Sequence, residues 1–442
     1  MATVNNNEII LQARQEISSS NAYQRLAMLF DDGAFTEVST FTKSSDTYAE
    51  AVAGYGVVNG CPVYAFAQNS EFAFGAMSTA QGAKLKKLYD MAVKTGCPVV
   101  GLYDSNGGRL TQGVDMLEAY GTILNSISNL SGVVPQISVI LGNCSGTAAL
   151  NAANADFIVM SKQGRLTLDT GASDSDIDSL KSDGLVDIFT ENEKQAIEST
   201  RKLISYLPSN NLSLSPIADT SEAEADNSTT DPIALTVDAG SFMELKSGSS
   251  SAVKLGLARI HGTVVAVVET NGKKLDCKAC KNTADFVSFA DAFAIPVVTF
   301  ANSSGFTCLT SASKLAAVYA QATTVKVTVV TGEAYGSFYV ALAGTGANAD
   351  ITFAWTDSSI APLPPITGAE ILWTDKMSVP VSQQKAVVEQ FKAEMCSAFA
   401  AAEKGYVEDV INPEETRAKV YAALDMLAGK RVSQLPKKHS TI

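Results

Sequence analysis

The chain repeats two of its own segments at long range. Leu29-Phe-Asp-Asp-Gly-Ala-Phe-Thr-Glu37 is similar to Val237-Asp-Ala-Gly-Ser-Phe-Met-Glu244. The glycine-containing segment from Val133 to Thr147 is similar to the segment from Thr323 to Ser337, and both pairs occur in the same order. A period this long exceeds the roughly 20–50 residues of a solenoid repeat. The sequence therefore predicts two domains of one fold, with an active site built between them.

Composition and charge narrow the class of protein. The 442 residues have room for two or three domains, and 46% of them are hydrophobic while 18% are charged. No apolar run reaches the length of a membrane span, and the N-terminus lacks the basic and apolar parts of a signal peptide. We therefore expect a cytoplasmic protein. The net charge of −13 argues against general nucleic-acid binding and against docking on an anionic membrane.

Cysteine and histidine offer few catalytic arrangements. Seven cysteines are an odd number spread over a long chain, so we expect a reducing compartment and no disulfide framework. Cys277-Lys-Ala-Cys280 is the single close pair, which is a weak zinc signal, and packing thiols are the favoured interpretation. The two histidines, His261 and His439, form no triad or metal cluster in the sequence, so we expect no metal and assign His261 to a turn.

Alternating strands and helices indicate βαβ crossovers and largely parallel sheets. The pattern predicts an N-terminal domain over residues 1–206, a polar linker over 207–232 and a C-terminal domain over 233–442. Helices are expected over the following ranges: 1–25, 80–94, 113–130, 282–292, 312–322 and much of 382–427. The basic end from Lys430 onwards is expected to be exposed.

Two glycine loops are the first candidates for chemistry. In each copy a β-rich run ends at Gly146-Thr147-Ala148 or at Gly336-Ser337, with helical residues after it. Backbone N–H groups at such a strand-to-helix junction can stabilise an enolate without any titrating side chain. A single loop of this kind is more often only a tight turn. Two equivalent loops favour a functional role.

A third candidate is Asp104-Ser-Asn-Gly-Gly-Arg109, whose counterpart is Asn302-Ser-Ser-Gly-Phe306. Glycines at the carboxyl end of a parallel strand often mark a loop that faces a ligand. The alternative is an ordinary turn in which Asp104 caps the next helix. Three nearby lysines could meet phosphate groups, but a solvated helix face is the favoured interpretation for them: Lys84, Lys86 and Lys87.

At these loops the chain resembles the carboxyltransferase subunits of biotin-dependent acyl-CoA carboxylases and of the related decarboxylases, a family that includes propionyl-CoA carboxylase beta and methylmalonyl-CoA decarboxylase alpha subunits. The resemblance implies an α/β fold of two tandem crotonase-like (ClpP-like) β-β-α superhelix domains, assembled as a hexamer, a trimer of dimers. It runs nearly end to end and depends on these segments: 29–37, 62–68, 104–115, 132–146, 292–300, 326–336 and 403–411.

The resemblance also implies substrates, partners and site residues. An acyl-CoA would bind on the N-terminal half and biotin, borne by a carrier protein, on the C-terminal half. A biotin carboxyl carrier protein and a biotin carboxylase are the implied partners, with a separate membrane subunit if the complex is a decarboxylase. The implied catalytic positions are Gly146, Thr147, Gly336, Ser337 and Phe338. The implied positions for holding substrate or cofactor are Gly107, Gly108, Arg109, Ser145, Ala148, Gly305, Phe306 and Tyr335.

The C-terminal half departs from the family pattern more than the N-terminal half. The family has Gly-Gly-Ala where this chain has Gly336-Ser337-Phe338, and Pro-Gly where it has Thr307-Cys308. A long glycine-rich loop after Phe306 is missing. Four readings stay open: carboxyl transfer to an acyl-CoA, decarboxylation in a sodium-pumping complex, a non-catalytic scaffold with a degenerate biotin half, and crotonase-type chemistry without biotin.

Overall fold

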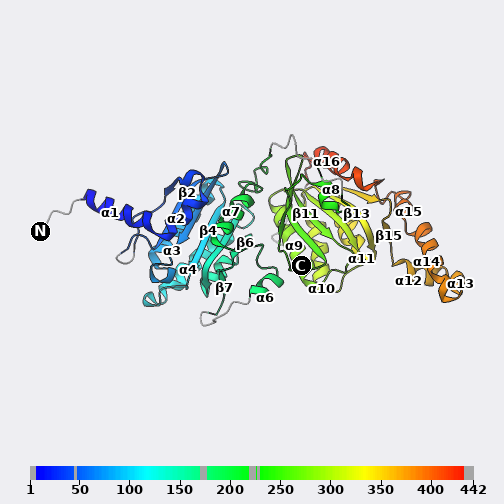
Figure 1. Cartoon of the computed structure of the whole chain (residues 1–442), viewed down its shortest axis with the longest axis horizontal. Helices are drawn as coiled ribbons and strands as arrows, with labels where there is room; N and C mark the ends of the chain where they lie inside the picture. The colour runs from blue at the N-terminus through cyan, green and yellow to red at the C-terminus, as the bar shows by residue number, and fades with distance from the viewer. Residues whose placement is uncertain (1–5, 44–46, 170–176, 219–224, 226–228, 433–442) are drawn as a thin grey trace. The chain divides into compact units, whose positions relative to one another are not determined.

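The computed structural model describes residues 6–43, 47–169, 177–218, 225 and 229–432. The chain divides into two compact units, Met1–Pro216 (the first unit) and Ile217–Ile442 (the second unit), each with its own sheet and helices (Figure 1). The division falls within the segment that was expected to be a linker, and part of that segment lies outside the described residues.

The first unit is built on one twisted sheet with strand order β1-β2-β3-β4-β5-β6-β8, and β7 pairs with the far end of β5. The first three strands are antiparallel and the others are parallel, as expected from the alternation of strands and helices. The strands are β1 (Phe35–Glu37), β2 (Ala51–Val58), β3 (Cys61–Gln68), β4 (Val99–Ser105), β5 (Gln136–Ser145), β6 (Phe157–Ser161), β7 (Arg165–Thr167) and β8 (Ile188–Thr190).

The second unit has the same strand order, β9-β10-β11-β12-β13-β14-β16, with β15 paired to the far end of β13. The predicted duplication of one fold is therefore present strand by strand. The strands are β9 (Met243–Leu245), β10 (Val253–Ile260), β11 (Thr263–Thr270), β12 (Val297–Ser303), β13 (Lys326–Tyr335), β14 (Ile351–Trp355), β15 (Ser359–Ala361) and β16 (Asp409–Ile411).

Helices flank both sheets, and the crossover helices α3 and α4 of the first unit pack together as α9 and α10 do in the second (Figure 1). The first unit has α1 (Asn6–Ser19), α2 (Asn21–Leu29), α3 (Thr79–Thr95), α4 (Asp115–Leu130), α5 (Thr147–Ala152), α6 (Ile177–Ser182) and α7 (Glu193–Ile204). The second unit has α8 (Pro232–Thr236), α9 (Cys277–Ala292), α10 (Leu309–Gln321), α11 (Gly336–Leu342), α12 (Pro365–Leu372), α13 (Thr374–Met377), α14 (Val381–Met395), α15 (Ala398–Ala402) and α16 (Thr416–Leu427).

Two helix predictions were wrong in detail. The single helix expected over 1–25 is broken at Ser20, whose hydroxyl accepts a hydrogen bond from the Tyr23 N–H and so caps a new helix, α2. The tail expected to be helical to Leu427 contains β16, which joins the edge of the second sheet. None of the helices in the described part of the chain combines the length and the apolar character that crossing a membrane requires.

The first repeated motif, residues 29–37, connects the β2–β3 hairpin to helix α7 through Asp31. The Asp31 carboxylate accepts hydrogen bonds from the N–H groups of Asn59 (3.0 Å) and Gly60 (3.2 Å), in the turn between β2 and β3. It also pairs with Arg201 of α7 at 2.7 Å. These contacts lower the pKa of Asp31 against the opposing effect of its burial.

The second copy of the motif makes the same contacts. The Asp238 carboxylate accepts from the N–H groups of His261 and Gly262, both at 2.9 Å, and pairs with Arg417 of α16 at 2.6 Å. His261 has a φ of 47° in the turn between β10 and β11, so its predicted role in a turn is confirmed. This repeated motif is therefore structural, and the chemistry must lie elsewhere.

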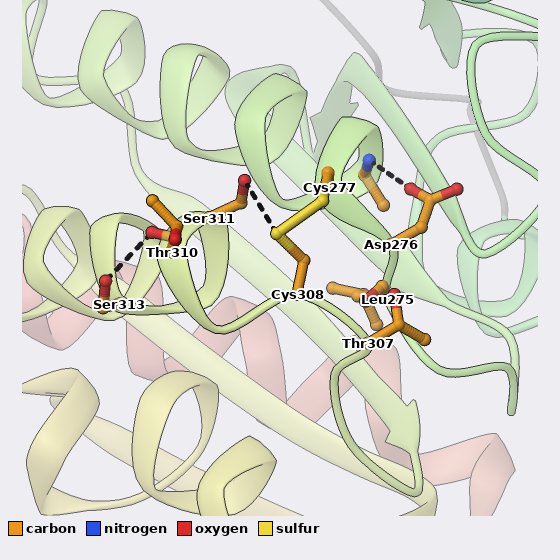
Figure 2. The surroundings of a disulfide bond; sticks show 9 residues. Leu275, Asp276, Cys277, Thr307, Cys308, Thr310, Ser311 and Ser313 are labelled. Atoms are coloured by element: carbon orange, nitrogen blue, oxygen red, sulfur yellow. Dashed lines mark hydrogen bonds between the residues drawn. A yellow bond between two sulfur atoms is a disulfide. The ribbon is translucent and has the colours of Figure 1, made fainter.

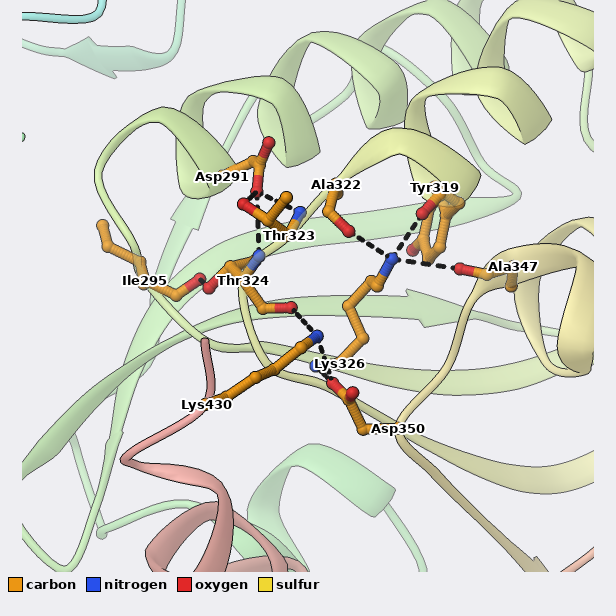
Figure 3. Close-up of polar contacts among 10 residues, drawn as sticks. All are labelled: Asp291, Ile295, Tyr319, Ala322, Thr323, Thr324, Lys326, Ala347, Asp350 and Lys430. Atoms are coloured by element: carbon orange, nitrogen blue, oxygen red, sulfur yellow. Dashed lines mark hydrogen bonds and ion pairs between the residues drawn. The ribbon is translucent and has the colours of Figure 1, made fainter. Parts of the chain in front are cut away.

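A buried lysine closes the end of α10 in the second unit (Figure 3). The Lys326 ammonium donates to the carbonyls of Tyr319, Ala322 (2.8 Å) and Ala347 (3.1 Å). The last carbonyls of a helix have no partner within the helix, and a cation near them is favourable. Lys430, expected to be exposed, instead pairs with Asp350 at 2.8 Å, with its side chain only 13% exposed. Residues 433–442 of the basic end, including His439, lie outside the described part of the chain.

Candidate functional site

The strand-to-helix junction of the first unit presents a backbone donor at Thr147. β5 ends at Ser145, Gly146 turns the chain with a φ of 62°, and α5 starts at Thr147. The Gly146 N–H donates to the Thr167 carbonyl of β7 at 2.9 Å, so this group is already engaged. The Thr147 N–H is the first of α5 and has no intrahelical acceptor. Of the two donors expected at Gly146 and Thr147, that of Thr147 is therefore the available one.

A second donor comes from the loop after β4. The Met77 N–H donates to the Gly107 carbonyl at 2.8 Å, and the Arg109 N–H donates to the Met77 carbonyl at 3.0 Å. Successive N–H groups of an extended chain point in opposite directions, so the Gly108 N–H faces away from Met77. Among the described residues no hydrogen bond of this N–H is found. Sequence reasoning had placed Gly108 among the binding residues without assigning it this donor.

The two residues that carry these donors, Gly108 and Thr147, line one cavity of about 940 Å³. Six of the predicted site residues line it, namely Gly107, Gly108, Arg109, Ser145, Gly146 and Thr147. Ala148, the seventh predicted site residue of this unit, is buried and is not among the residues that line the cavity. Much of the remaining wall is apolar and comes from Phe72, Phe74, Leu110, Val114, Met116, Leu117 and Tyr120. The cavity thus combines a polar end with a long apolar wall, as binding sites for small molecules commonly do.

Arg109 lines the cavity, but its charge is paired inside the protein. Its guanidinium contacts Glu50 at 2.8 Å, with the two side chains only 13% and 5% exposed. The guanidinium carbon lies 4.9 Å from the centre of the Phe72 ring, and Nε donates to the Ala76 carbonyl. These contacts hold the two sides of the cavity mouth together. We therefore assign Arg109 to the wall of the cavity and not to a phosphate site.

Asp104 does not cap the next helix, which was the alternative raised for this loop. Its carboxylate pairs with Arg25 of α2 at 2.9 Å and accepts from the Asn143 N–H at 3.2 Å. In the second unit Asn302 accepts from the Glu333 N–H at 3.0 Å in the same way. Both side chains therefore join two neighbouring parallel strands just before the glycine junctions, which keeps each junction in place.

The three lysines of α3 do not form one solvated face. Lys84 is buried, and its ammonium donates to the Ala51 carbonyl at 2.9 Å. Burial lowers the pKa of Lys84 to about 8, against the attraction of Glu37 and Glu50. Lys86 pairs with Asp90 on the surface at 2.6 Å, and Lys87 is exposed. The prediction of a solvated face is confirmed for Lys86 and Lys87 and was wrong for Lys84.

The second unit repeats the backbone of this site. β13 ends at Tyr335 and α11 begins at Gly336, where φ is 49°. Leu275 makes hydrogen bonds to the residues on either side of Phe306, as Met77 does to those on either side of Gly108. The Leu275 N–H donates to the Gly305 carbonyl at 3.0 Å, and the Leu275 carbonyl accepts from the Thr307 N–H at 2.9 Å. The Phe306 N–H therefore faces the same way as that of Gly108.

The side chains on this second backbone are much larger. Phe306 stands where the first unit has Gly108, and Phe338 stands where it has Ala148, counted from Gly146 and Gly336. Phe338 is fully buried, and the two rings lie 5.9 Å apart. Tyr335 is also buried, which raises its pKa to about 12, while Ser337 is exposed. The predicted second site thus exists as a backbone arrangement filled by aromatic rings.

A disulfide fastens the loop that carries Phe306 (Figure 2). It joins Cys277, the first residue of α9, to Cys308, the residue before α10, and their Cα atoms are 5.4 Å apart. The expectation of unpaired packing thiols was wrong for Cys277, although Cys280 is a free, buried thiol. The partners are separated by 31 residues, so only the packing of α9 beside α10 shows that they meet.

Comparisons with known proteins agree over nearly the whole chain. The family model described as the carboxyl transferase domain matches residues 17–174 and 178–442. Methylmalonyl-CoA decarboxylase subunit alpha of Veillonella parvula is 34% identical, covering 95% of this chain and 92% of its own. Propionyl-CoA carboxylase beta chain of Saccharopolyspora erythraea is 33% identical, with coverage of 95% and 90%. The crystal structure of transcarboxylase 12S with hydrolysed methylmalonyl-coenzyme A bound is 28% identical, with a TM-score of 0.91 and coverage of 100% and 99%.

Proposed function

Because the chain belongs to the carboxyl transferase domain family, we propose that it moves a carboxyl group between biotin on a carrier protein and a short-chain acyl-CoA. The resemblance seen in the sequence and the tandem crotonase-like fold are both confirmed. Decarboxylation of a malonyl-type CoA is the second candidate, because the decarboxylase subunit from Veillonella parvula is about as similar as the carboxylase subunit. Both directions pass through the same enolate, so one site serves either.

The observation that carries the proposal is the pair of backbone donors in the cavity of the first unit. In decarboxylation the bond between the α-carbon and the carboxylate breaks, and its electron pair enters the thioester as an enolate. In carboxylation the α-carbon gives up a proton, which the ureido nitrogen of biotin would accept once its carboxyl group has left as CO2, and the α-carbon of the resulting enolate then forms a bond to CO2. In both cases negative charge develops on the thioester oxygen, where the N–H groups of Gly108 and Thr147 would stabilise it.

The described wall of the cavity offers no side chain suited to act as a catalytic base. Among the described residues that line the cavity there is no carboxylate and no imidazole. Burial raises the pKa of Tyr120, so its hydroxyl stays neutral. Apolar side chains such as Phe74, Leu110 and Val114 exclude water and so protect the enolate from protonation. Hydrolases and isomerases of the crotonase type need a positioned acid or base, which makes that reading the weakest.

Biotin supplies or receives the carboxyl group when it is present. At the predicted positions Gly336, Ser337 and Phe338 of the second unit, the Phe338 ring is buried against Phe306 and leaves little room for the fused bicyclic ring of biotin. Gly305 and Tyr335 are also buried there. The catalytic steps proposed above therefore depend only on groups of the first unit.

Assembly and partners follow from the relatives. The transcarboxylase 12S structure is a hexamer and binds its substrate within a multienzyme core. We infer that this chain also forms a hexamer and works with a biotin carboxyl carrier protein and a biotin carboxylase. For the decarboxylation reaction the membrane component would be a separate subunit.

The proposal is tested with the purified chain, free biotin, and malonyl-CoA or methylmalonyl-CoA carrying ¹⁴C in the free carboxyl group. Loss of label from the CoA ester that depends on biotin is the expected result, and the faster substrate identifies the acyl group. Calorimetry with each acyl-CoA measures binding separately. Binding without any loss of label would favour the scaffold reading, and absence of both would overturn the proposal.

A further inference from the structure

We propose that Phe338 is a specificity-determining residue that closes the site of the second unit and limits the use of biotin as carboxyl donor or acceptor. This inference rests on the proposed function and deepens it. It comes from comparing the two units of this chain, which have the same backbone junction but different side chains there.

The first unit shows how an open junction looks. Gly108 has no side chain, and even a Cβ added to it would contact Tyr120 and Met116 tightly, at 3.2–3.4 Å. Ala148, at the second position of α5, contributes only a methyl group. The result is a cavity reached by both backbone donors.

In the second unit the same two positions close the space. The ring of Phe338, from the third residue of α11, packs on the ring of Phe306, with the ring planes inclined at 52°. No part of Phe338 is exposed. Two aromatic rings thus pack beside the Gly336 junction, where the first unit has only Gly108 and Ala148.

Of the two rings, that of Phe306 is the fixed one. Its loop is bracketed by the two hydrogen bonds of Leu275, and Ser303 donates its hydroxyl to the Gly305 carbonyl at 3.1 Å. Two residues further on, the Cys277–Cys308 disulfide ties the loop to α9 (Figure 2). Because the backbone that carries Phe306 is held in place, Phe338 is the residue whose replacement is expected to open space beside the junction.

The test is Phe338→Ala, measured in the assay with labelled malonyl-CoA over a range of free biotin concentrations. Removing the ring is expected to raise kcat/KM for biotin about tenfold or more, the scale on which pocket size discriminates substrates. The KM for the acyl-CoA and its calorimetric affinity are expected to stay unchanged, since both report on the first unit.

Two further variants make the result decisive. Phe353→Ala removes another buried ring of the same unit, from the core around β14, and is expected to leave kcat/KM for biotin unchanged. Phe338→Leu keeps the core filled and is expected to give a smaller rise, which covers the case that the alanine variant fails to fold.

Two results would overturn the inference: an unchanged kcat/KM for biotin in both folded Phe338 variants, or an equal rise in Phe353→Ala. Failure of the proposed function looks different. In that case neither the wild-type protein nor any variant binds acyl-CoA or loses label.

Discussion

At the scale of single residues, the groups that we propose to act in this protein are backbone N–H groups and not side chains. Thr147 and Gly146 are neighbours, yet only one of their N–H groups is free, because Gly146 is bonded to Thr167 of β7. The second donor is the Gly108 N–H. The neighbouring residues Gly107 and Arg109 are the ones that hydrogen-bond to Met77, so the Gly108 N–H faces the other way. Pairing between strands thus decides which amide can act.

Thr147→Pro removes the donor at the start of α5. Proline is well tolerated at the first position of a helix, so the fold is expected to persist while the cavity loses one N–H. Turnover of labelled malonyl-CoA is expected to fall roughly 100–1000-fold, the usual loss for one donor of an oxyanion hole. Thr147→Ala keeps the N–H and should retain near-normal turnover. Equal activity in the two variants would remove Thr147 from the mechanism.

The aspartates that directly precede β6 and β14 occupy equivalent positions with different neighbours. Asp156 accepts from the Gln136 N–H at 2.8 Å. Asp350 accepts from the Lys326 N–H at 2.8 Å and in addition pairs with Lys430. For Asp156, burial raises the pKa to about 7, and the nearby charge of Asp187 adds to this effect.

This raised pKa predicts a pH dependence of stability. The folded state holds the Asp156 proton up to about pH 7, whereas the unfolded chain releases it near pH 3.8. The contribution to stability is therefore complete below pH 4 and disappears as the pH rises through 7, a change on the order of 4 kcal/mol. Asp156→Asn should abolish this slope in urea unfolding measured from pH 5 to pH 8. An unchanged slope would contradict the assignment.

At the scale of elements, helix ends and loops are held by contacts from far along the chain. The C-terminal end of α10 is capped by Lys326 of β13, and the loop before α10 is tied to α9 by the disulfide. The Lys326 hydrogen bonds and the disulfide thus hold the two ends of α10, the helix that follows the Phe306 loop. The stability of the second site therefore depends on residues outside it.

Lys326→Met keeps most of the side-chain volume but leaves three buried carbonyls without their donor. Each unsatisfied group costs about 1–3 kcal/mol, so we expect a loss of about 3 kcal/mol or more in the free energy of unfolding. Lys314→Met changes an exposed lysine of α10, the helix that Lys326 caps, and should alter stability little. Chemical denaturation of the two variants measures the difference, and equal midpoints would show that the three hydrogen bonds contribute nothing.

Removal of the disulfide is expected to destabilise the second unit. A cross-link that closes a loop of this length contributes about 3 kcal/mol, mainly by restricting the unfolded chain. Cys308→Ser should therefore lower the melting temperature by several degrees, and a reducing agent should do the same to the wild-type protein. Cys97→Ser, which alters a half-buried free thiol, is the control. An unaltered melting temperature in Cys308→Ser would mean that the bond does not form in solution.

At the scale of the whole molecule, duplication has produced two units with one backbone and two different interiors. The first keeps an open, apolar-walled cavity, and the second is filled at the same place. Both units also carry large apolar side chains on their surfaces, including Leu117 on the first and Leu372 on the second, which are 66% exposed each. Such surfaces are typical of proteins that bury them in an assembly.

The expected assembly is a hexamer. Light scattering on the purified chain should give a mass about six times that of one subunit, because the transcarboxylase 12S structure with the same fold is hexameric. Leu372→Asp places a charge on the exposed apolar surface of α12 and is expected to lower this mass without unfolding the subunit. A monomeric wild-type protein would contradict the proposed assembly.

Much of this architecture follows from local sequence. The internal repeat predicts two units of one fold, and the hydrophobic alternation predicts the sheets and most helices, because both depend on neighbouring residues. The glycines at 146 and 336 identify the two junctions, since a positive φ there favours glycine. The replacement of alanine by Phe338 is also visible in the sequence.

Only the tertiary structure decided which groups at these junctions are free. The engagement of Gly146, the pairing of Arg109 with Glu50, the burial of Lys84 and the Cys277–Cys308 bond all join residues that are distant in the chain. Their partners arrive through strand order and helix packing, which no local pattern specifies. The sequence by itself thus determined where the site lies, and the packed fold determined which of its atoms can act.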